Sequence, residues 1–444
     1  MNYKFSVFNF LIFGKGKITI KNFATGSVVV LDRNDFKILS KIISERSALP
    51  KWARSLTGVN GILVKENFDE FSFLRKLLNQ AFLASSNQLV VYFLPTLLCQ
   101  FKCFYCLEHK KDKAVAKTVI PGLEKMLIKW LKTYLSINSD IKKLKIVFFG
   151  GEPLLRKDLI KRILAKVKFL TNKLKVDFVT ELITNGELIE ENIMESFLEN
   201  NLRRIQITLD GFREEHNKVR FSVKGGSFDK IVENIIMIID KKYISMVDLR
   251  ISLMEDNFLS IKKLLRHLYR SGLSSKISLT IGVIQDFGSE SSCGACTEHE
   301  EFSENMAKKY LSLILYGKKL GFNTEPEFVA GPICFASLRH SVVVKPDGGM
   351  QKCFCSVGQK KFDFANIFDK DKNMILFDQR YSYENNRTEK CFSEKCPFVP
   401  VCNGGCVWRS IFKNPPNGYL NRNCNKTAMS IINSGLIKSE FCNC

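Results

Sequence analysis

The residues best suited to chemistry are three closely spaced cysteines, Cys99, Cys103 and Cys106, in the pattern C-x3-C-x2-C. They directly follow the apolar run 89–94, which is typical of a strand. Three thiolates can hold three irons of a [4Fe-4S] cluster, and because a complete ligand set has four cysteines, one iron would keep an open position. Buried thiols or half of a zinc knuckle are the alternatives, but zinc pairs usually occur as C-x2-C with a matching second pair. We therefore expect an iron-sulfur cluster with one reactive iron.

The elements that must position this loop alternate strand and helix from residue 89 on. Apolar or β-branched runs at 89–94, 145–149, 178–184, 204–209, 249–254 and 278–283 are separated by amphipathic helical stretches. Such runs are typical of parallel strands buried on both faces. Six strand–helix repeats predict an α/β fold, a partial (β/α)6 TIM-like barrel, with functional residues on the loops after the strands' carboxyl ends.

Glycine and polar residues follow the second and third predicted strands. Gly150, Gly151 and Glu152 come after the second strand. The glycines let the backbone approach a ligand closely, and the carboxylate can accept hydrogen bonds from an ammonium group. Thr184 and Asn185 end the third strand, where short polar side chains can reach ribose hydroxyls across the barrel mouth. Plain turn and capping residues are the alternative at each position.

Polar residues also follow the fourth predicted strand. Taken together, these motifs resemble those of the radical S-adenosylmethionine (radical SAM) enzymes. Thr208 and Asp210 end this strand, and Arg220 follows. The resemblance rests on the cysteine pattern, with Tyr105 beside its last member, and on the Gly-Gly-Glu segment.

This resemblance implies cofactors and roles. The catalytic residues would be Cys99, Cys103 and Cys106, which hold the [4Fe-4S] cluster whose open iron binds the methionine end of S-adenosylmethionine. One electron, from an external donor such as flavodoxin or ferredoxin, then releases a 5'-deoxyadenosyl radical. Residues implied to bind S-adenosylmethionine are Tyr105, Gly150, Gly151, Glu152, Thr184, Asn185, Thr208, Asp210 and Arg220.

The last third of the chain is rich in cysteine in a second pattern. Ser341 to Lys345, followed by Pro346-Asp347-Gly348-Gly349, predicts a hairpin. The cysteines around and after it resemble the SPASM extension of radical SAM enzymes, although the first gap of its quartet has four residues instead of two. The resemblance implies two auxiliary clusters, one on Cys391, Cys396, Cys402 and Cys424 and one on Cys334, Cys353 and Cys406.

The second auxiliary set has only three members. An eighth ligand could be Cys355, Cys293, Cys296, Cys442 or Cys444, or it could be absent. Zinc in two four-thiolate sites is the alternative to iron.

Residues 1–88 are expected to form a separate α+β, winged-helix-like module. Lys17 to Ile20 and Ser27 to Leu31 predict a hairpin, 35–43 and 71–82 predict helices, 58–64 a short wing, and 5–13 a strand. The order resembles the leader-peptide-recognition module of enzymes that modify ribosomally made peptides; a structural or dimerisation cap is the alternative. The expected domains are 1–88, the radical SAM barrel at 89–325 and the SPASM domain at 326–444.

Composition limits the remaining choices. Fifteen cysteines with no export signal predict metal or redox chemistry in the cytoplasm. A formal net charge of +22 predicts a basic surface, but the lysines are scattered, so nucleic acid gains no support. No apolar run reaches the roughly 18 residues of a membrane span. Phosphate-loop, metalloprotease and nucleophile-elbow motifs are absent from the sequence.

The resemblance implies a radical SAM/SPASM peptide maturase, an oxidoreductase-type enzyme whose partner is a precursor peptide. A thioether crosslink is the first expectation. Alternatives are formylglycine formation as in sulfatase maturases, carbon-carbon or carbon-oxygen crosslinking, and a non-catalytic iron-sulfur or zinc scaffold.

Overall fold

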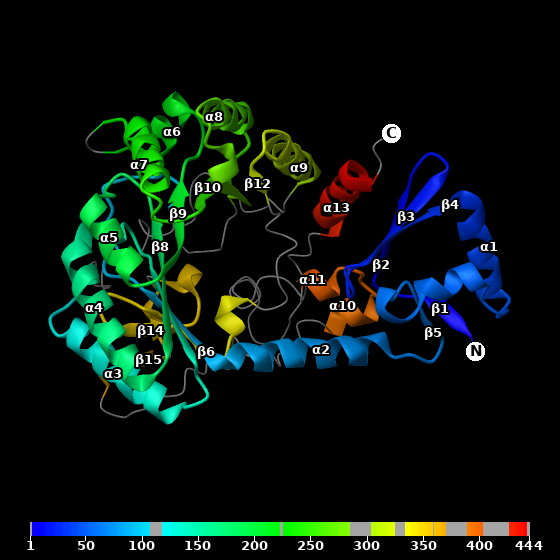
Figure 1. Ribbon diagram of the computed structural model, residues 1–444, viewed down its shortest axis with the longest axis horizontal. Helices are drawn as coiled ribbons and strands as arrows, with labels where there is room; N and C mark the ends of the chain where they lie inside the picture. Colours follow the sequence, from blue (N-terminus) through cyan, green and yellow to red (C-terminus); the bar gives the residue numbers. More distant parts are fainter. Residues whose placement is uncertain are drawn as a thin grey trace.

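A computed structural model describes residues 2–106, 118–222, 225–284, 303–324, 334–357, 359–369, 389–402 and 426–441. A large α/β part and a smaller N-terminal part lie at opposite ends of the molecule, and helix α2 runs along one side between them (Figure 1). Six cysteines considered above lie outside the described residues: Cys293, Cys296, Cys406, Cys424, Cys442 and Cys444.

The large part is built on one ten-stranded sheet, and the six predicted strands form its parallel centre in chain order. They are β6 (Gln88–Phe93), β7 (Lys143–Phe148), β8 (Asp177–Thr184), β9 (Leu202–Thr208), β10 (Val247–Leu253) and β11 (Ile277–Val283). This arrangement confirms the predicted α/β class with a large, mostly parallel sheet. The short strand β12 (Asn323–Thr324) extends the sheet beyond β11.

Helices cover one face of this sheet (Figure 1). They are α3 (Leu123–Ile137), α4 (Lys157–Leu174), α5 (Glu191–Glu199), α6 (Arg213–Val219), α7 (Phe228–Asp240), α8 (Phe258–Arg270) and α9 (Glu304–Lys319). Alternate strand residues such as Val91, Ile146 and Ile207 belong to one buried core with the apolar helix faces. The expectation that the strands are buried in apolar surroundings on both faces is wrong, because the intervening residues include Lys145 and Arg204, which are partly exposed.

A cysteine-bearing hairpin extends the sheet at its other end. Strands β13 (Ser341–Val344) and β14 (Gly349–Gln351) pair antiparallel, as predicted, and β15 (Ala365–Asn366) pairs with β14. The structure adds a pairing that local sequence does not show: β13 lies parallel to β6, with Val342 opposite Val91. The hairpin of the last third is therefore continuous with the sheet that begins at residue 88.

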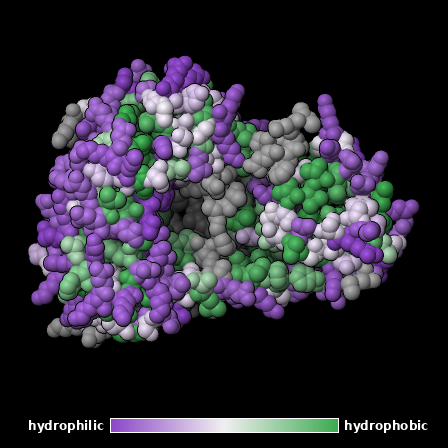
Figure 2. Space-filling model, viewed as in Figure 1, coloured by the Kyte–Doolittle hydropathy of each residue, from purple (hydrophilic) through white to green (hydrophobic). Residues whose placement is uncertain are grey.

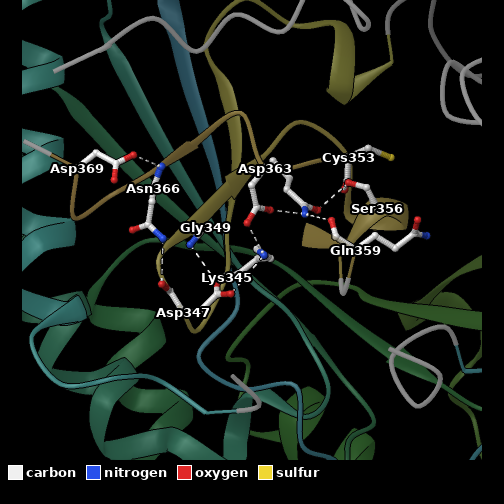
Figure 3. Close-up of polar contacts among 10 residues, drawn as sticks. Lys345, Asp347, Gly349, Cys353, Ser356, Gln359, Asp363, Asn366 and Asp369 are labelled. Carbon is white, nitrogen blue, oxygen red and sulfur yellow. Dashed lines mark hydrogen bonds and ion pairs between the residues drawn. The ribbon is translucent and has the colours of Figure 1, made fainter. Parts of the chain in front are cut away.

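A fully buried lysine anchors this hairpin (Figure 3). Lys345 Nζ lies 2.9 Å from Asp363 Oδ2 and 3.4 Å from Asp347 Oδ2. Gln351 Nε2 donates to the second Asp363 oxygen at 2.5 Å, and Ser356 Oγ donates to Gln351 Oε1 at 2.7 Å. The chain of contacts therefore runs from a buried ammonium to the turn that follows Cys353.

The N-terminal part contains the predicted hairpin and helices. Strands β2 (Asn9–Phe13), β3 (Lys17–Asn22) and β4 (Val28–Asp32) form an antiparallel sheet, flanked by α1 (Arg33–Ser44) and α2 (Glu70–Ala84). The wing region supplies β5 (Leu63–Lys65), which pairs with β1 (Tyr3–Phe5). The strand expected over 5–13 is broken, because Val7 N–H donates to the buried Glu70 carboxylate at 3.2 Å and Ser6 Oγ also donates to it.

Aromatic side chains join the N-terminal part to the C-terminal cysteine segment, which comprises α10 (Glu389–Ser393), α11 (Val399–Cys402) and, further on, α13 (Lys426–Phe441). The Phe398 ring lies 5.3 Å from Phe10 and 5.0 Å from Phe23. Phe392 lies 4.9 Å from Phe71 of α2. Residues from both ends of the chain thus share one hydrophobic cluster.

Across the residues that the structure describes, no helix combines the length and apolar character needed to cross a membrane.

Removing the Asp363 carboxylate should lower the free energy of unfolding, because Lys345 would lose its shorter ion pair. Asp363→Ala leaves a fully buried ammonium with one long contact to Asp347, and breaking a buried pair in this way costs about 3–5 kcal/mol. Glu191→Ala, which removes the exposed partner of Lys241, should cost less than about 1 kcal/mol. Urea unfolding followed by circular dichroism measures both; equal losses would contradict the prediction.

Candidate active site

The three predicted cluster cysteines lie on one loop after β6. Cys103 is buried, while Cys99 and Cys106 are partly exposed, and none is in a disulfide. Phe101 N–H lies 3.4 Å from Cys99 Sγ, and Cys106 N–H donates to Cys103 O at 3.1 Å. The loop therefore presents three thiols from eight consecutive residues, held by its own backbone.

Gly150 and Gly151, which follow β7, pack against this cysteine loop. Gly151 N–H donates to Thr96 O at 3.0 Å, and Glu152 N–H donates to Leu98 O at 2.8 Å. A Cβ on Gly150 would lie 2.4 Å from Thr96 O, and one on Gly151 would lie 2.2 Å from Leu98 O. The close approach that glycine permits is thus made to the chain's own cysteine loop.

Glu152 is completely buried and accepts three hydrogen bonds. Its Oε1 accepts from Leu154 N–H at 2.9 Å and from Thr184 Oγ1 at 2.8 Å, and its Oε2 accepts from Asn185 N–H at 2.8 Å. Burial outweighs these bonds and raises the pKa of Glu152 to about 7. Thr184 therefore contacts the carboxylate, whereas the resemblance implied a contact to the nucleoside.

Asn185 links this carboxylate to the cysteine loop. Its side-chain Nδ2 lies 3.6 Å from Cys99 Sγ, and its Oδ1 accepts from Gln100 Nε2 at 3.3 Å. Because the Asn185 backbone also donates to Glu152, one residue touches both groups. The ends of β6, β7 and β8 thus converge on a single site.

A second loop holds the other side of the cysteine loop. Lys102 N–H donates to Phe221 O at 2.9 Å, next to a bridge between Phe101 and Ser222. Within this contact Asp210, Arg220 and Tyr105 meet: Arg220 Nε lies 2.5 Å from Asp210 Oδ2, and the Tyr105 hydroxyl donates to the same oxygen.

The charge on Asp210 is stabilised by this network. Burial opposes its ionisation, but the Arg220 charge and the hydrogen bonds outweigh burial and lower the pKa of Asp210. Ser252 N–H donates to the other carboxylate oxygen at 2.8 Å. Thr208, the remaining predicted contact, is buried at the end of β9 opposite Arg250. Tyr105, Asp210 and Arg220 therefore belong to one rigid unit.

The donor set suits an iron-sulfur cluster. Burial raises the pKa of Cys99 to about 12, and iron would supply the positive charge that stabilises the thiolate. Cys99, Cys103 and Cys106 are the residues that would hold it. Among the described residues no three His, Cys, Asp or Glu side chains already converge as a metal site.

The described auxiliary cysteines form two separate groups. Cys391, Cys396 and Cys402 lie in or against the cluster shared with the N-terminal part. Cys353 is buried and its thiol is hydrogen-bonded to that of Cys355. Phe335, which follows Cys334, and Phe354, which follows Cys353, pack on Tyr92 of β6 at 4.6 and 5.9 Å. Cys406 and Cys424 fall outside the described residues.

Sequence reasoning missed a set of charged residues on the sheet face opposite the helices. We call Lys145, Glu181, Arg204 and Asp248 the inner belt. Lys145 Nζ lies 2.7 Å from Glu181 Oε1, and Arg204 Nε donates to Asp248 Oδ2 at 2.7 Å. The signal was the presence of charged residues inside four strands that are otherwise rich in apolar residues.

Comparisons with known proteins show what this chain is similar to. Residues 93–268 match the sequence model of the radical SAM superfamily. A GTP 3',8-cyclase from Clostridium perfringens is 26% identical over 271 residues, 57% of this chain and 77% of that protein. One from Aliarcobacter butzleri is 35% identical over 117 residues, which cover 26% of this chain and 33% of that protein.

Solved structures show the same fold. Native anSMEcpe with bound AdoMet and a peptide matches with a TM-score of 0.56 at 18% identity, covering 79% of this chain and 97% of that one. SuiB of Streptococcus suis, bound to the precursor peptide SuiA, matches with a TM-score of 0.50 at 16% identity, covering 92% and 96%. The segment 93–268, which carries the cysteine loop and buried Glu152, therefore matches a radical SAM domain.

Gly151→Ala should damage the site through the cysteine loop. The new Cβ would lie 2.2 Å from Leu98 O and 2.6 Å from the Leu97 carbonyl carbon, both backbone atoms, so the loop must shift at a cost of about 1–3 kcal/mol. We expect reconstituted protein to lose iron from this loop. Gly14→Ala, whose Cβ would meet nothing closer than 3.5 Å, should keep it. The iron content of the two variants is measured after anaerobic reconstitution. An unchanged iron content in Gly151→Ala would contradict the prediction that this close contact supports the cysteine loop.

Proposed function

We propose that this enzyme is a peptide maturase that cleaves S-adenosylmethionine reductively and installs a crosslink in a precursor peptide. The observation that carries the proposal is the single site in which Asn185 joins the Cys99 loop to buried Glu152. A [4Fe-4S] cluster held by Cys99, Cys103 and Cys106 supplies the electron for this cleavage when bound. In this proposal the parallel strands β6 to β11 form a partial barrel with the helices on its outer face.

The chain's own residues bind and orient the sulfonium substrate. Glu152 accepts the ammonium group of its methionine end, which adds a charged partner to a carboxylate already fixed by three donors. Tyr105 on the cysteine loop and Thr208 at the end of β9 would line the nucleoside, and Asp210 and Arg220 hold Tyr105 in place. Fixed positions of these groups and exclusion of water keep the reactive carbon beside the peptide.

The N-terminal part supplies a surface for the peptide. β4 is at the end of its sheet, so its outer edge can pair with an extended segment. Val30 of β4 and Ile38 of the neighbouring α1 are 40% and 49% exposed, and hydrophobic residues gather on this part in Figure 2. Both SuiB and anSMEcpe have been solved with a bound peptide, which favours a leader-binding role for this module.

The C-terminal cysteines hold auxiliary clusters in this proposal. The first set is Cys391, Cys396, Cys402 and Cys424, and the second is Cys334, Cys353 and Cys406. A thioether from a substrate cysteine is the preferred product, with flavodoxin or ferredoxin as electron donor. Formylglycine formation and carbon-carbon crosslinking use the same residues and differ only in product, so mass spectrometry of the modified peptide distinguishes them.

Cys99→Ala should abolish formation of 5'-deoxyadenosine from S-adenosylmethionine. Without this thiol the loop retains two cluster ligands, too few to hold a site-differentiated cluster. Anaerobically reconstituted protein with a strong reductant, analysed by chromatography alongside iron and sulfide content, provides the test. About eight to twelve irons per wild-type chain are expected with auxiliary clusters. Persistent cleavage in the variant would refute the site, and zinc in place of iron would favour a binding scaffold.

Binding of S-adenosylmethionine should weaken at acidic pH. Because burial raises the pKa of Glu152 to about 7, the carboxylate that accepts the ammonium is protonated below this value. Affinity should be constant above pH 7 and fall by about tenfold per pH unit below it. The stability of the ligand-free protein should change in the opposite direction. Its buried site favours protonated Glu152, so the free energy of unfolding should fall as pH rises through 7.

Equilibrium dialysis between pH 6 and 8.5 measures this profile. Glu190→Gln, at an exposed carboxylate paired with Lys157, should have the wild-type profile. A flat profile in the wild type would show that Glu152 does not bind the ammonium.

A further inference from the structure

The inner belt is a connected network on the open face of the sheet. Asp248 Oδ2 accepts from Arg204 Nε at 2.7 Å and from Gln206 Nε2 at 2.8 Å, and Asp248 Oδ1 accepts from Thr280 Oγ1 at 2.7 Å. Glu181 pairs with Lys145 at 2.7 Å. Four neighbouring strands, β7 to β10, each contribute one charged member to the network.

The exposed charge of the inner belt is positive. The Lys145 and Arg204 side chains are 29% and 40% exposed, whereas Glu181 and Asp248 are each only 10% exposed. Both carboxylates already accept bonds within the network, so the groups that face the space beside the sheet are an ammonium and a guanidinium. Arg204 Nη1 forms an ion pair with Glu181 Oε2 at 4.0 Å, a distance too long for a hydrogen bond, so its N–H groups can still donate to an added anion.

Two carboxylates hold the Arg204 guanidinium in place. Asp248 accepts from its Nε and Nη2 side, and Glu181 attracts Nη1. An arginine fixed in this way loses little rotamer freedom when it binds a planar anion. Because apolar residues of similar volume would often be as stable on this face, stability alone does not account for the network.

The inner belt shares its face with the proposed reaction site. Arg204, Gln206 and Thr208 alternate along β9 and so point to the same side. At about 3.3 Å per residue, Arg204 lies roughly 13 Å along the strand from Thr208. An extended peptide covers this distance in about four residues.

We propose that the inner belt binds a side-chain carboxylate of the peptide substrate, from an Asp or Glu within about four residues of the modified residue. This inference rests on the proposed function, since it names a recognition element of the same peptide. Arg204 is the main contact and Lys145 adds charge. The inner belt therefore selects for sequence next to the modified residue, independently of the N-terminal module.

The test compares two synthetic decapeptides with blocked ends and a neutral dye, Ala-Ser-Gly-Ser-Glu-Ser-Gly-Ser-Gly-Ala and the same peptide with Gln in place of Glu. Fluorescence anisotropy with reconstituted full-length protein measures the ratio of their dissociation constants. The wild type should bind the acidic peptide about tenfold more tightly. In Arg204→Gln the ratio should fall below about two, while Arg204→Lys should retain part of the preference.

Matched variants keep the result interpretable. Arg162→Gln removes an ion-paired arginine from the outer helix layer and should keep the wild-type ratio. Lys145→Gln leaves all partners of Asp248 in place, so it reports on the inner belt even where Arg204→Gln fails to fold. Equal or undetectable binding of the two peptides by the wild type, or an intact preference in both belt variants, would overturn the proposal.

Formation of 5'-deoxyadenosine in the same preparation separates the two hypotheses. Cleavage without an acidic preference refutes only the inner-belt assignment. An acidic preference without cleavage refutes the proposed function and leaves the binding site standing.

Discussion

The contact between the glycine pair and the cysteine loop is the constraint on which the site depends. Two backbone hydrogen bonds fasten residues 151 and 152 to Thr96 and Leu98, and side chains at either glycine would collide with backbone. This contact sets where Glu152 lies relative to Cys99. Once Glu152 is in place, Thr184 and Asn185 are fixed by bonding to it.

The site holds several groups whose burial opposes their charge. Glu152 and Cys99 both have raised pKa values because they are removed from water. Asp210 differs because Arg220 neutralises it within the fold. In the proposed function, an ammonium group would stabilise the Glu152 carboxylate and a metal would stabilise the Cys99 thiolate, since both groups are held away from water.

The large sheet joins segments that are distant in sequence. Because β13 pairs with β6, the turn that carries Cys353 lies beside the strand that leads into Cys99, with Tyr92 packed against Phe335 and Phe354. At the other end of the molecule, Phe392 and Phe398 pack on the N-terminal part. The C-terminal cysteine segments thus contact both the catalytic sheet and the proposed peptide-binding module.

The sequence by itself determined the six parallel strands, the β13–β14 hairpin, the N-terminal hairpin and the positions of the loops that carry the proposed site, because apolar runs, turn residues and cysteine spacing are local signals. Only the tertiary structure decided the partners of these groups. It placed Thr184 on Glu152, paired β13 with β6 and broke the first strand at Glu70. It also revealed the inner belt, since Lys145, Glu181, Arg204 and Asp248 are far apart in the sequence and no local pattern links them. Parallel pairing of β7 to β10 brings these four residues together in one network.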